Sequence, residues 1–202
     1  MEVNTVGSKK INKTAIRKMV LCAVFIALII ALSFIPNTGY INTPGLAITT
    51  LHVIVIVGSV MLGWKYGLVL GAVWGILCEI VAVMYAEVMF YNPIVSVMPR
   101  ILVGFVAAVV FRAVSKTKLG IIGGCIVAAI AGTLTNTVLV LSTLYIFGGT
   151  IKEFSDAFNA IKDIILVIIS VNGGVELAIA VILTPAIVRP LYPTLRSHGI
   201  MQ

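Results

Sequence analysis

Charged residues are scarce in this chain: only 10% of its 202 residues are Asp, Glu, Lys or Arg, against about 25% in ordinary soluble domains. Apolar residues make up 60% of the sequence, and the mean hydropathy is +1.17. This composition excludes a soluble enzyme, a secreted disulfide scaffold and a disordered tail, and it indicates a chain that lies within a lipid bilayer. The three cysteines, Cys22, Cys78 and Cys125, are far apart in apolar runs, which argues against a disulfide framework or a metal site.

Catalytic motifs are also missing. The sequence contains no G-x-x-x-x-G-K-[ST] loop for ATP, no H-E-x-x-H zinc motif and no G-x-S-x-G nucleophile elbow. Its two histidines are His52 and His198, and no serine is well placed to work with His52. These absences disfavour an enzyme, and we expect no cofactor. The alternative of another class is a membrane-embedded enzyme acting at the outer leaflet, with Glu79, His52 and Glu176 as acid and base groups.

Six apolar runs account for most of the chain and predict an all-α membrane protein built as a six-helix bundle. The predicted spans are about 19–35, 51–62, 67–84, 95–114, 119–147 and 164–188. Residues 148–163 have mixed charge and apolar side chains at helical spacing, which predicts a short amphipathic helix on the membrane surface. We expect a single membrane domain over 1–202, with a basic N-terminal segment over 1–18, the bundle over 19–188 and a tail over 189–202.

The positive charges are distributed unevenly between the two sides of the predicted bundle. Eleven of the fourteen Lys and Arg residues fall on the side that holds both termini, whereas the other side holds only Lys152 and Lys162. Because short cytoplasmic loops are enriched in Lys and Arg, this pattern predicts that both termini are cytoplasmic. The net charge of +7 is therefore read as membrane topology, and nucleic acid is not an expected partner.

Small residues recur every four positions in three of the predicted helices. Such rows allow helix backbones to approach closely within a membrane. The rows Gly67, Gly71, Gly75 and Gly120, Gly124, Ala128, Gly132 predict packing inside the bundle. The row Ala23, Ala27, Ala31 in the first span is compatible with packing or with contact to another protein.

Polar side chains gather in the predicted outer half of the bundle. Because buried polar groups are costly in a membrane, they usually face a cavity or one another. A cluster confined to one half predicts a pocket that opens to the outside, rather than a channel. The candidate binding residues are Asn37, Tyr40, Asn42, His52, Glu79, Asn92, Arg100, Asn136 and Asn172.

Structural alternatives accompany several of these candidates. Glu79 and Arg100 are alternatively a plain ion pair, and His52 is alternatively a cap at the start of the second helix. Asn136 and Asn172 are alternatively groups that bond neighbouring helices. A packing subunit without a ligand is therefore also an open hypothesis.

Three sequence features together resemble one family. They are the Ala23, Ala27, Ala31 row after a basic N-terminus, the stretch FIPNTGYINTPGLAITTLHVIVIVGSVMLGWKYG over 34–67, and PRILVG over 99–104. The chain resembles the substrate-binding S component of energy-coupling factor (ECF) vitamin transporters, a family of multi-pass proteins of the bacterial cell membrane. The resemblance covers the chain from the first helix to the sixth.

The resemblance implies a function and partners. An S component binds a water-soluble vitamin or precursor on the outer side, beneath a gate formed here by residues 36–50. It then docks on a transmembrane coupling protein, the T component, which is joined to two ABC ATPases, and the Ala row would form the coupling surface. The sequence is most similar to pantothenate-type members, and Arg100 would match the pantothenate carboxylate.

Members for hydroxymethylpyrimidine, pyridoxine or riboflavin share much of the pattern and remain alternatives. Riboflavin ranks lower, because Trp64 and Trp74 are expected toward the inner side, away from the pocket.

Overall fold

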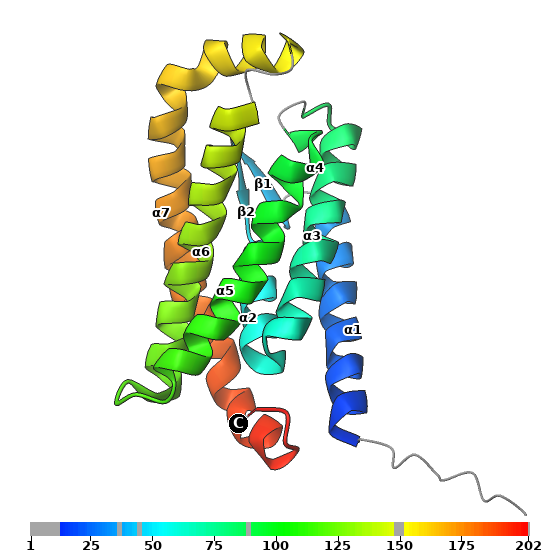
Figure 1. Cartoon of the computed structure of the whole chain (residues 1–202), viewed down its shortest axis with the longest axis vertical. Coiled ribbons are helices and arrows are strands. Elements are labelled where there is room, and N and C mark those ends of the chain that lie inside the picture. The colour runs from blue at the N-terminus through cyan, green and yellow to red at the C-terminus, as the bar shows by residue number, and fades with distance from the viewer. Residues whose placement is uncertain (1–12, 36–37, 44–45, 88–89, 148–151, 202) are drawn as a thin grey trace, which may run out of the picture.

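The computed structural model describes residues 13–35, 38–43, 46–87, 90–147 and 152–201, and for residues 41–43, 46–48 and 152–172 it describes the backbone only. Helices dominate these residues (Figure 1). They are α1 (Lys13–Phe34), α2 (Leu51–Leu62), α3 (Trp64–Met84), α4 (Pro93–Ser96), α5 (Met98–Val114), α6 (Gly120–Phe147) and α7 (Lys152–Ser197). A two-stranded hairpin consists of β1 (Tyr40–Thr43) and β2 (Leu46–Thr49).

Five helical segments are long and apolar enough to cross a membrane, and one of them, Pro93–Val114, comprises α4 and α5 together. The twelve-residue α2 is the sixth, shorter apolar helix. The prediction of an all-α six-helix membrane protein is therefore confirmed. The helices run side by side along the long axis of the molecule (Figure 1).

The two ends of this bundle differ in what they hold. We call the end with the hairpin and α4 the upper end, and the end with the start of α1 and the turn between α2 and α3 the lower end (Figure 1). The turn at the lower end consists of Gly63 alone, with φ 94°. Glycine adopts this backbone conformation without strain, whereas other residues do not. A single glycine therefore suffices to reverse the chain direction between α2 and α3. The third helix consequently begins at Trp64, earlier than the predicted start at residue 67.

The predicted surface helix over 148–163 and the predicted sixth span over 164–188 are wrong as separate elements. From residue 152 the structure has one helix, α7, whose first turns lie across the upper end before it bends down along the bundle (Figure 1). Three prolines within it, Pro185, Pro190 and Pro193, do not end it, and it continues to Ser197. Beyond it the chain turns back, and Ile200 and Met201 are buried beside the end of α2 at the lower end.

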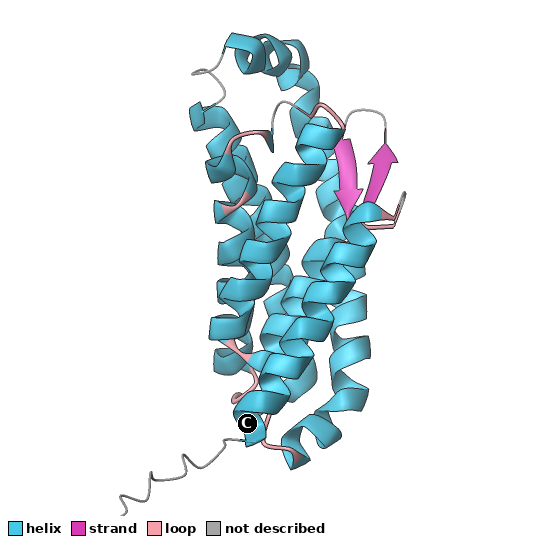
Figure 2. Ribbon diagram, turned by 90° about the vertical axis from the view of Figure 1, so that its right-hand side faces the viewer, coloured by secondary structure: helices cyan, strands magenta, loops and turns pink. Residues whose placement is uncertain are grey.

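The hairpin lies within the segment 36–50, which the family resemblance implies as the gate above the binding site. Its strands pair in antiparallel register, with Tyr40 opposite Thr49, and lie beside the upper half of the helices (Figure 2). The base is tied to the end of α1, because the Gly39 N–H donates to the Leu32 carbonyl at 3.1 Å. The Thr50 hydroxyl also donates to the Thr38 carbonyl at 2.7 Å. The hairpin therefore has a fixed position over the bundle interior.

The glycine rows pack inside the bundle, as predicted, except at Gly120, where an added Cβ would meet no atom within 4 Å. A Cβ atom at Gly67 would lie 2.5 Å from the Gly104 carbonyl oxygen, and one at Gly75 would lie 2.6 Å from the Val97 Cα. The row in α3 thus allows the backbone of α5 to approach closely. In α6, a Cβ at Gly132 would lie 2.9 Å from the Ile56 side chain of α2. By contrast, Ala23, Ala27 and Ala31 are exposed on the outer face of α1.

Candidate functional site

Arg100 lies in the first turn of α5 and is only 5% exposed. Its Nη1 donates to the Val95 carbonyl at 2.8 Å, and its Nη2 contacts the Cys78 Sγ at 3.5 Å. The guanidinium lies 5.4 Å from the ring centroids of both Trp74 and Phe90, which is within cation–π range. The groups in direct contact with this buried cation are therefore neutral, and the Glu176 carboxylate lies within electrostatic range but forms no ion pair with it.

No ion pair joins Arg100 to Glu79 in the described structure, so the ion-pair alternative is wrong. Glu79 is half-buried and follows Cys78 on α3. Successive helical residues point about 100° apart, and Cys78 and Trp74, four residues apart, share the face toward Arg100. Among the described residues, the Arg100 Nε has no hydrogen-bond partner. The guanidinium thus retains a donor for a further partner.

The hairpin and α7 meet at a second buried contact. The Thr49 N–H donates to Glu176 Oε1 at 2.6 Å, which ties β2 to α7 across 127 residues of sequence. Opposite Thr49 in the register, the Tyr40 phenol lies close to Cys78, Trp74 and Arg100, and its buried oxygen forms no well-aligned hydrogen bond with them. Burial raises the pKa of the Tyr40 phenol, so the group is a neutral hydroxyl.

His52 completes the cluster from the first turn of α2. It is fully buried, and neither ring nitrogen has a hydrogen-bond partner among the described residues. The residue before α2 is Thr50, and no side chain caps the helix, so the alternative of His52 as a cap is wrong.

Asn136, on α6, lies at the same height along the bundle axis as His52. Gly132 packs on Ile56, and since α2 and α6 run in opposite directions, Asn136 and His52 each lie one turn above that contact. The Asn136 Oδ1 is also buried without a partner, which gives no support to the alternative of a bond between helices.

The other predicted residues have different positions. The Asn92 Oδ1 accepts from the Ile94 N–H at 2.9 Å and caps α4. For Asn42 and Asn172 only the backbone is described, with Asn42 paired to Ala47 in the hairpin and Asn172 within α7. Asn37 lies outside the described residues.

Several residues of the cluster were missed by the sequence reasoning. Trp74 and Phe90 flank Arg100, whereas Trp74 was expected away from the pocket. The signal for Trp74 was its spacing, because it lies three residues after Gly71 and four before Cys78 on the face that packs on α5. The Thr49 backbone and the Glu176 carboxylate were likewise not predicted as partners.

The cluster shares one chemical property. Among the described residues, eight buried side-chain polar atoms lack a hydrogen-bond partner, and six of them belong to the side chains described above. They are Tyr40 Oη, His52 Nδ1, His52 Nε2, Trp74 Nε1, Arg100 Nε and Asn136 Oδ1. Since an unsatisfied buried polar group costs about 1–3 kcal/mol, such a concentration points to a ligand that supplies the missing partners.

The arrangement suits a small polar solute better than a metal. One cation, flanked by two aromatic rings and surrounded by hydrogen-bond donors and acceptors, can recognise an anionic group and neutral polar groups together. Among the residues that the structure describes, no three His, Cys, Asp or Glu side chains lie together as metal ligands.

The fold is that of a multi-pass membrane protein, and the cluster is its candidate site for a small polar solute. Over residues 17–188 the chain matches the family described as ECF transporter, substrate-specific component. The chain belongs to this family, so the resemblance stated from the sequence is confirmed.

Two curated relatives agree with the family. The chain is 36% identical over 160 residues to the pantothenic acid transporter PanT of Lactococcus lactis subsp. cremoris, covering 71% of this chain and 76% of that protein. It is 29% identical over 210 residues to the pantothenate transporter PanT of Leuconostoc mesenteroides subsp. mesenteroides, covering 94% of this chain and 98% of that protein. Both relatives are named as transporters, which favours transport over the enzyme alternative.

Proposed function

We propose that this chain binds pantothenate at the upper end, on the outside of the cell membrane, and delivers it inward through a separate energising module. The distribution of charge supports this orientation. Lys13, Arg17, Lys65, Arg112 and Arg196 all flank helices at the lower end, which by the positive-inside rule faces the cytoplasm.

The observation that carries the choice of pantothenate is the buried guanidinium of Arg100. It forms no hydrogen bond or ion pair with a carboxylate among the described residues, although Glu176 lies within electrostatic range. Pantothenate supplies a carboxylate, and an Arg–carboxylate pair forms strong charge-assisted hydrogen bonds. Its hydroxyl and amide groups match Tyr40, His52 and Asn136, whose polar atoms are unpartnered. Both named relatives are pantothenate transporters, which supports the same solute.

Calorimetry on the purified full chain in detergent tests this proposal. We expect tight binding of pantothenate and much weaker binding of pantothenol, in which an alcohol replaces the carboxylate. Arg100→Gln should weaken pantothenate binding by at least about tenfold, since removing one partner of a buried charge pair costs roughly 2–5 kcal/mol. The same variant should bind pantothenol almost as well as the wild type does.

Arg112→Gln is the matched control, because Arg112 lies on the same helix and is exposed at its lower end. This variant should bind pantothenate like the wild type. Tight binding of hydroxymethylpyrimidine, pyridoxine or riboflavin instead of pantothenate would retain the family and reject this solute. Equal affinity for pantothenate and pantothenol would reject the role of Arg100.

The exposed Ala row supports the second half of the proposal, docking on a T component that is joined to two ABC ATPases. Of the 22 residues of α1, only Cys22, Ile29 and Ser33 are buried, and the Ala row lies on roughly the opposite side of the helix. A row of small residues on an exposed helix allows another helix to approach closely.

Vitamin uptake in cells tests this docking. Ala27→Trp should leave pantothenate binding intact and abolish uptake, because the bulky ring would prevent close approach of the partner helix. Leu28→Trp, exposed but about 100° around α1, should retain most of the uptake. Equal loss in both variants would argue against a specific coupling surface.

A further inference from the structure

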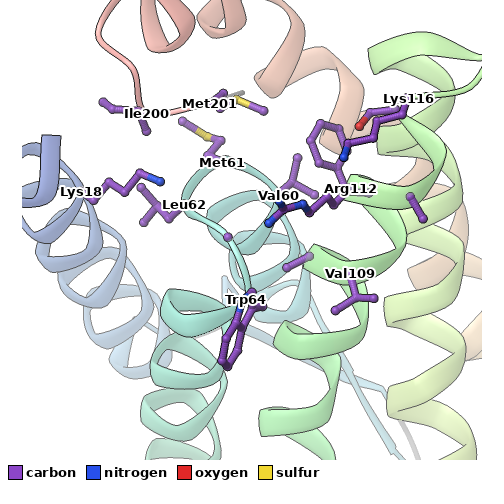
Figure 3. A pocket seen from close by; sticks show the side chains of 15 residues that line it. Lys18, Val60, Met61, Leu62, Trp64, Val109, Arg112, Lys116, Ile200 and Met201 are labelled. Atoms are coloured by element: carbon purple, nitrogen blue, oxygen red, sulfur yellow. The ribbon is translucent and has the colours of Figure 1, made fainter.

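A cavity of about 740 Å³ lies at the lower end, away from the candidate substrate site. The end of α2, the Gly63 turn, the last turns of α5, Lys18 of α1 and the buried residues Ile200 and Met201 surround it (Figure 3). No step of the proposed substrate binding uses this cavity.

Three cationic side chains line the cavity: Lys18, Arg112 and Lys116. Lys18 extends into it from one side and Arg112 from the other (Figure 3). None of the described acidic residues lines it, and no ion pair within the described structure involves these three cations. The cavity therefore carries concentrated positive charge without an internal counter-charge, and it favours an anion.

The rest of the lining is apolar and continues onto the outer surface of the bundle. Val60, Met61 and Leu62 form the inner wall. Trp64 and Val109 also line the cavity and are 43% and 44% exposed on the surface. The ring of Trp64 packs edge-on against Phe105 at 6.2 Å, which extends the apolar surface upward along α3 and α5.

We propose that this cavity binds the phosphate of an anionic phospholipid, with an acyl chain lying along Trp64, Phe105 and Val109. A free phosphate would use the same cations, but only a lipid also covers the adjoining apolar surface. The position at the end of the membrane-spanning helices, where Trp side chains and basic clusters occur, fits a headgroup depth. The proposal rests on the membrane location of the chain and is independent of which solute the upper end binds.

Fluorescence quenching by brominated lipids tests the proposal. The full chain is placed in nanodiscs of phosphatidylcholine that contain a small fraction of either brominated phosphatidylglycerol or brominated phosphatidylcholine. The chain has two tryptophans, and Trp64 lies at the cavity mouth whereas Trp74 is buried. We expect brominated phosphatidylglycerol to quench Trp64 at a lower lipid fraction than brominated phosphatidylcholine does.

The variants separate a defined site from general surface charge. Arg112→Gln and Lys116→Gln should each reduce the preference for phosphatidylglycerol about fivefold, as expected for one lost cation near a membrane surface. Lys118→Gln is the matched control, because Lys118 is exposed in the same loop but does not line the cavity. It should retain the preference, and all three variants should bind pantothenate normally.

Three results would overturn the proposal. Equal quenching of the wild type by the two brominated lipids would exclude an anion-selective site. An equal effect of Lys118→Gln would assign the preference to general surface charge. Displacement of brominated phosphatidylglycerol by millimolar inorganic phosphate would assign the cavity to a small phosphate and reject the lipid.

Discussion

Arg100 and Arg112 lie twelve residues apart on α5, about 18 Å along its axis, and their surroundings differ in kind. Arg100 is buried between two aromatic rings, surrounded by polar atoms that lack partners. Arg112 is exposed beside an open cavity that other cations share. A buried cation is desolvated and is satisfied only by a partner of matching geometry, whereas an exposed one keeps its water.

The comparison sets two proposed recognition regions of one bundle against each other. At the proposed upper site, selectivity would depend on shape, because each unpartnered group requires a particular atom of the ligand. At the proposed lower site, affinity would depend on summed charge and adjoining apolar surface. Three further experiments address this difference, in order of decreasing effect.

The largest effect is expected at Gly71, where a Cβ atom would collide with the carbonyl oxygen of Arg100. Gly71→Ala should push α5 away from α3 and displace the Arg100 side chain. Overpacking of this kind costs about 3 kcal/mol, which should lower the unfolding midpoint and weaken pantothenate binding together.

Gly174→Ala is the control for that measurement. A Cβ atom at Gly174 has no neighbour within 4 Å, so this variant should leave stability unchanged or raise it by up to about 1 kcal/mol through better helix propensity. If Gly71→Ala had the unfolding midpoint and the pantothenate affinity of the wild type, the close approach of α3 and α5 would not be what positions Arg100.

A smaller effect is expected at Glu176, whose carboxylate holds the Thr49 N–H. Glu176→Ala leaves that buried donor unsatisfied and should cost about 2 kcal/mol. Because this contact ties the hairpin to α7, amide hydrogen exchange in β1 and β2 should accelerate and pantothenate should dissociate faster.

Glu176→Gln keeps an acceptor oxygen at the same position and should restore most of the protection. Glu87→Ala, an exposed acid at the upper end, should have no effect on exchange in the hairpin. If Glu176→Ala left the hairpin fully protected, the contact would not be what holds the hairpin over the site.

Much of the fold could be predicted from the sequence because membrane spans depend on local composition. The apolar runs predicted the membrane-spanning helices, and the four-residue spacing of Gly67, Gly71 and Gly75 predicted the face of α3 that packs on α5. Continuity of α7 past three prolines could not be predicted, because a proline favours a helix end unless packing in the folded bundle holds the helix together.

The sequence identified only some residues of the candidate site, because contacts between residues far apart in the sequence leave no local pattern. His52, Arg100 and Asn136 were selected because polar groups in apolar segments are conspicuous, and Tyr40 was selected from the loop that precedes the second helix. The bond between Thr49 and Glu176 depends on tertiary structure and has no local signal. Trp74 was expected near the inner side. In the structure α3 begins at Trp64, so Trp74 lies about 15 Å above the lower end of that helix.

The smallest effect on stability is expected at Asn92. The sequence predicted that Asn92 binds the solute, whereas in the structure its side chain caps α4, and the two roles predict different effects on pantothenate affinity. Its side chain caps α4, so Asn92→Ala should destabilise the protein by about 1 kcal/mol. Asn92→Asp and Asn92→Ser retain a capping oxygen and should restore the unfolding midpoint. A cap does not touch the solute, so pantothenate affinity should stay close to that of the wild type in all three variants. A loss of affinity in Asn92→Ser, with the midpoint restored, would instead place Asn92 among the groups that bind the ligand.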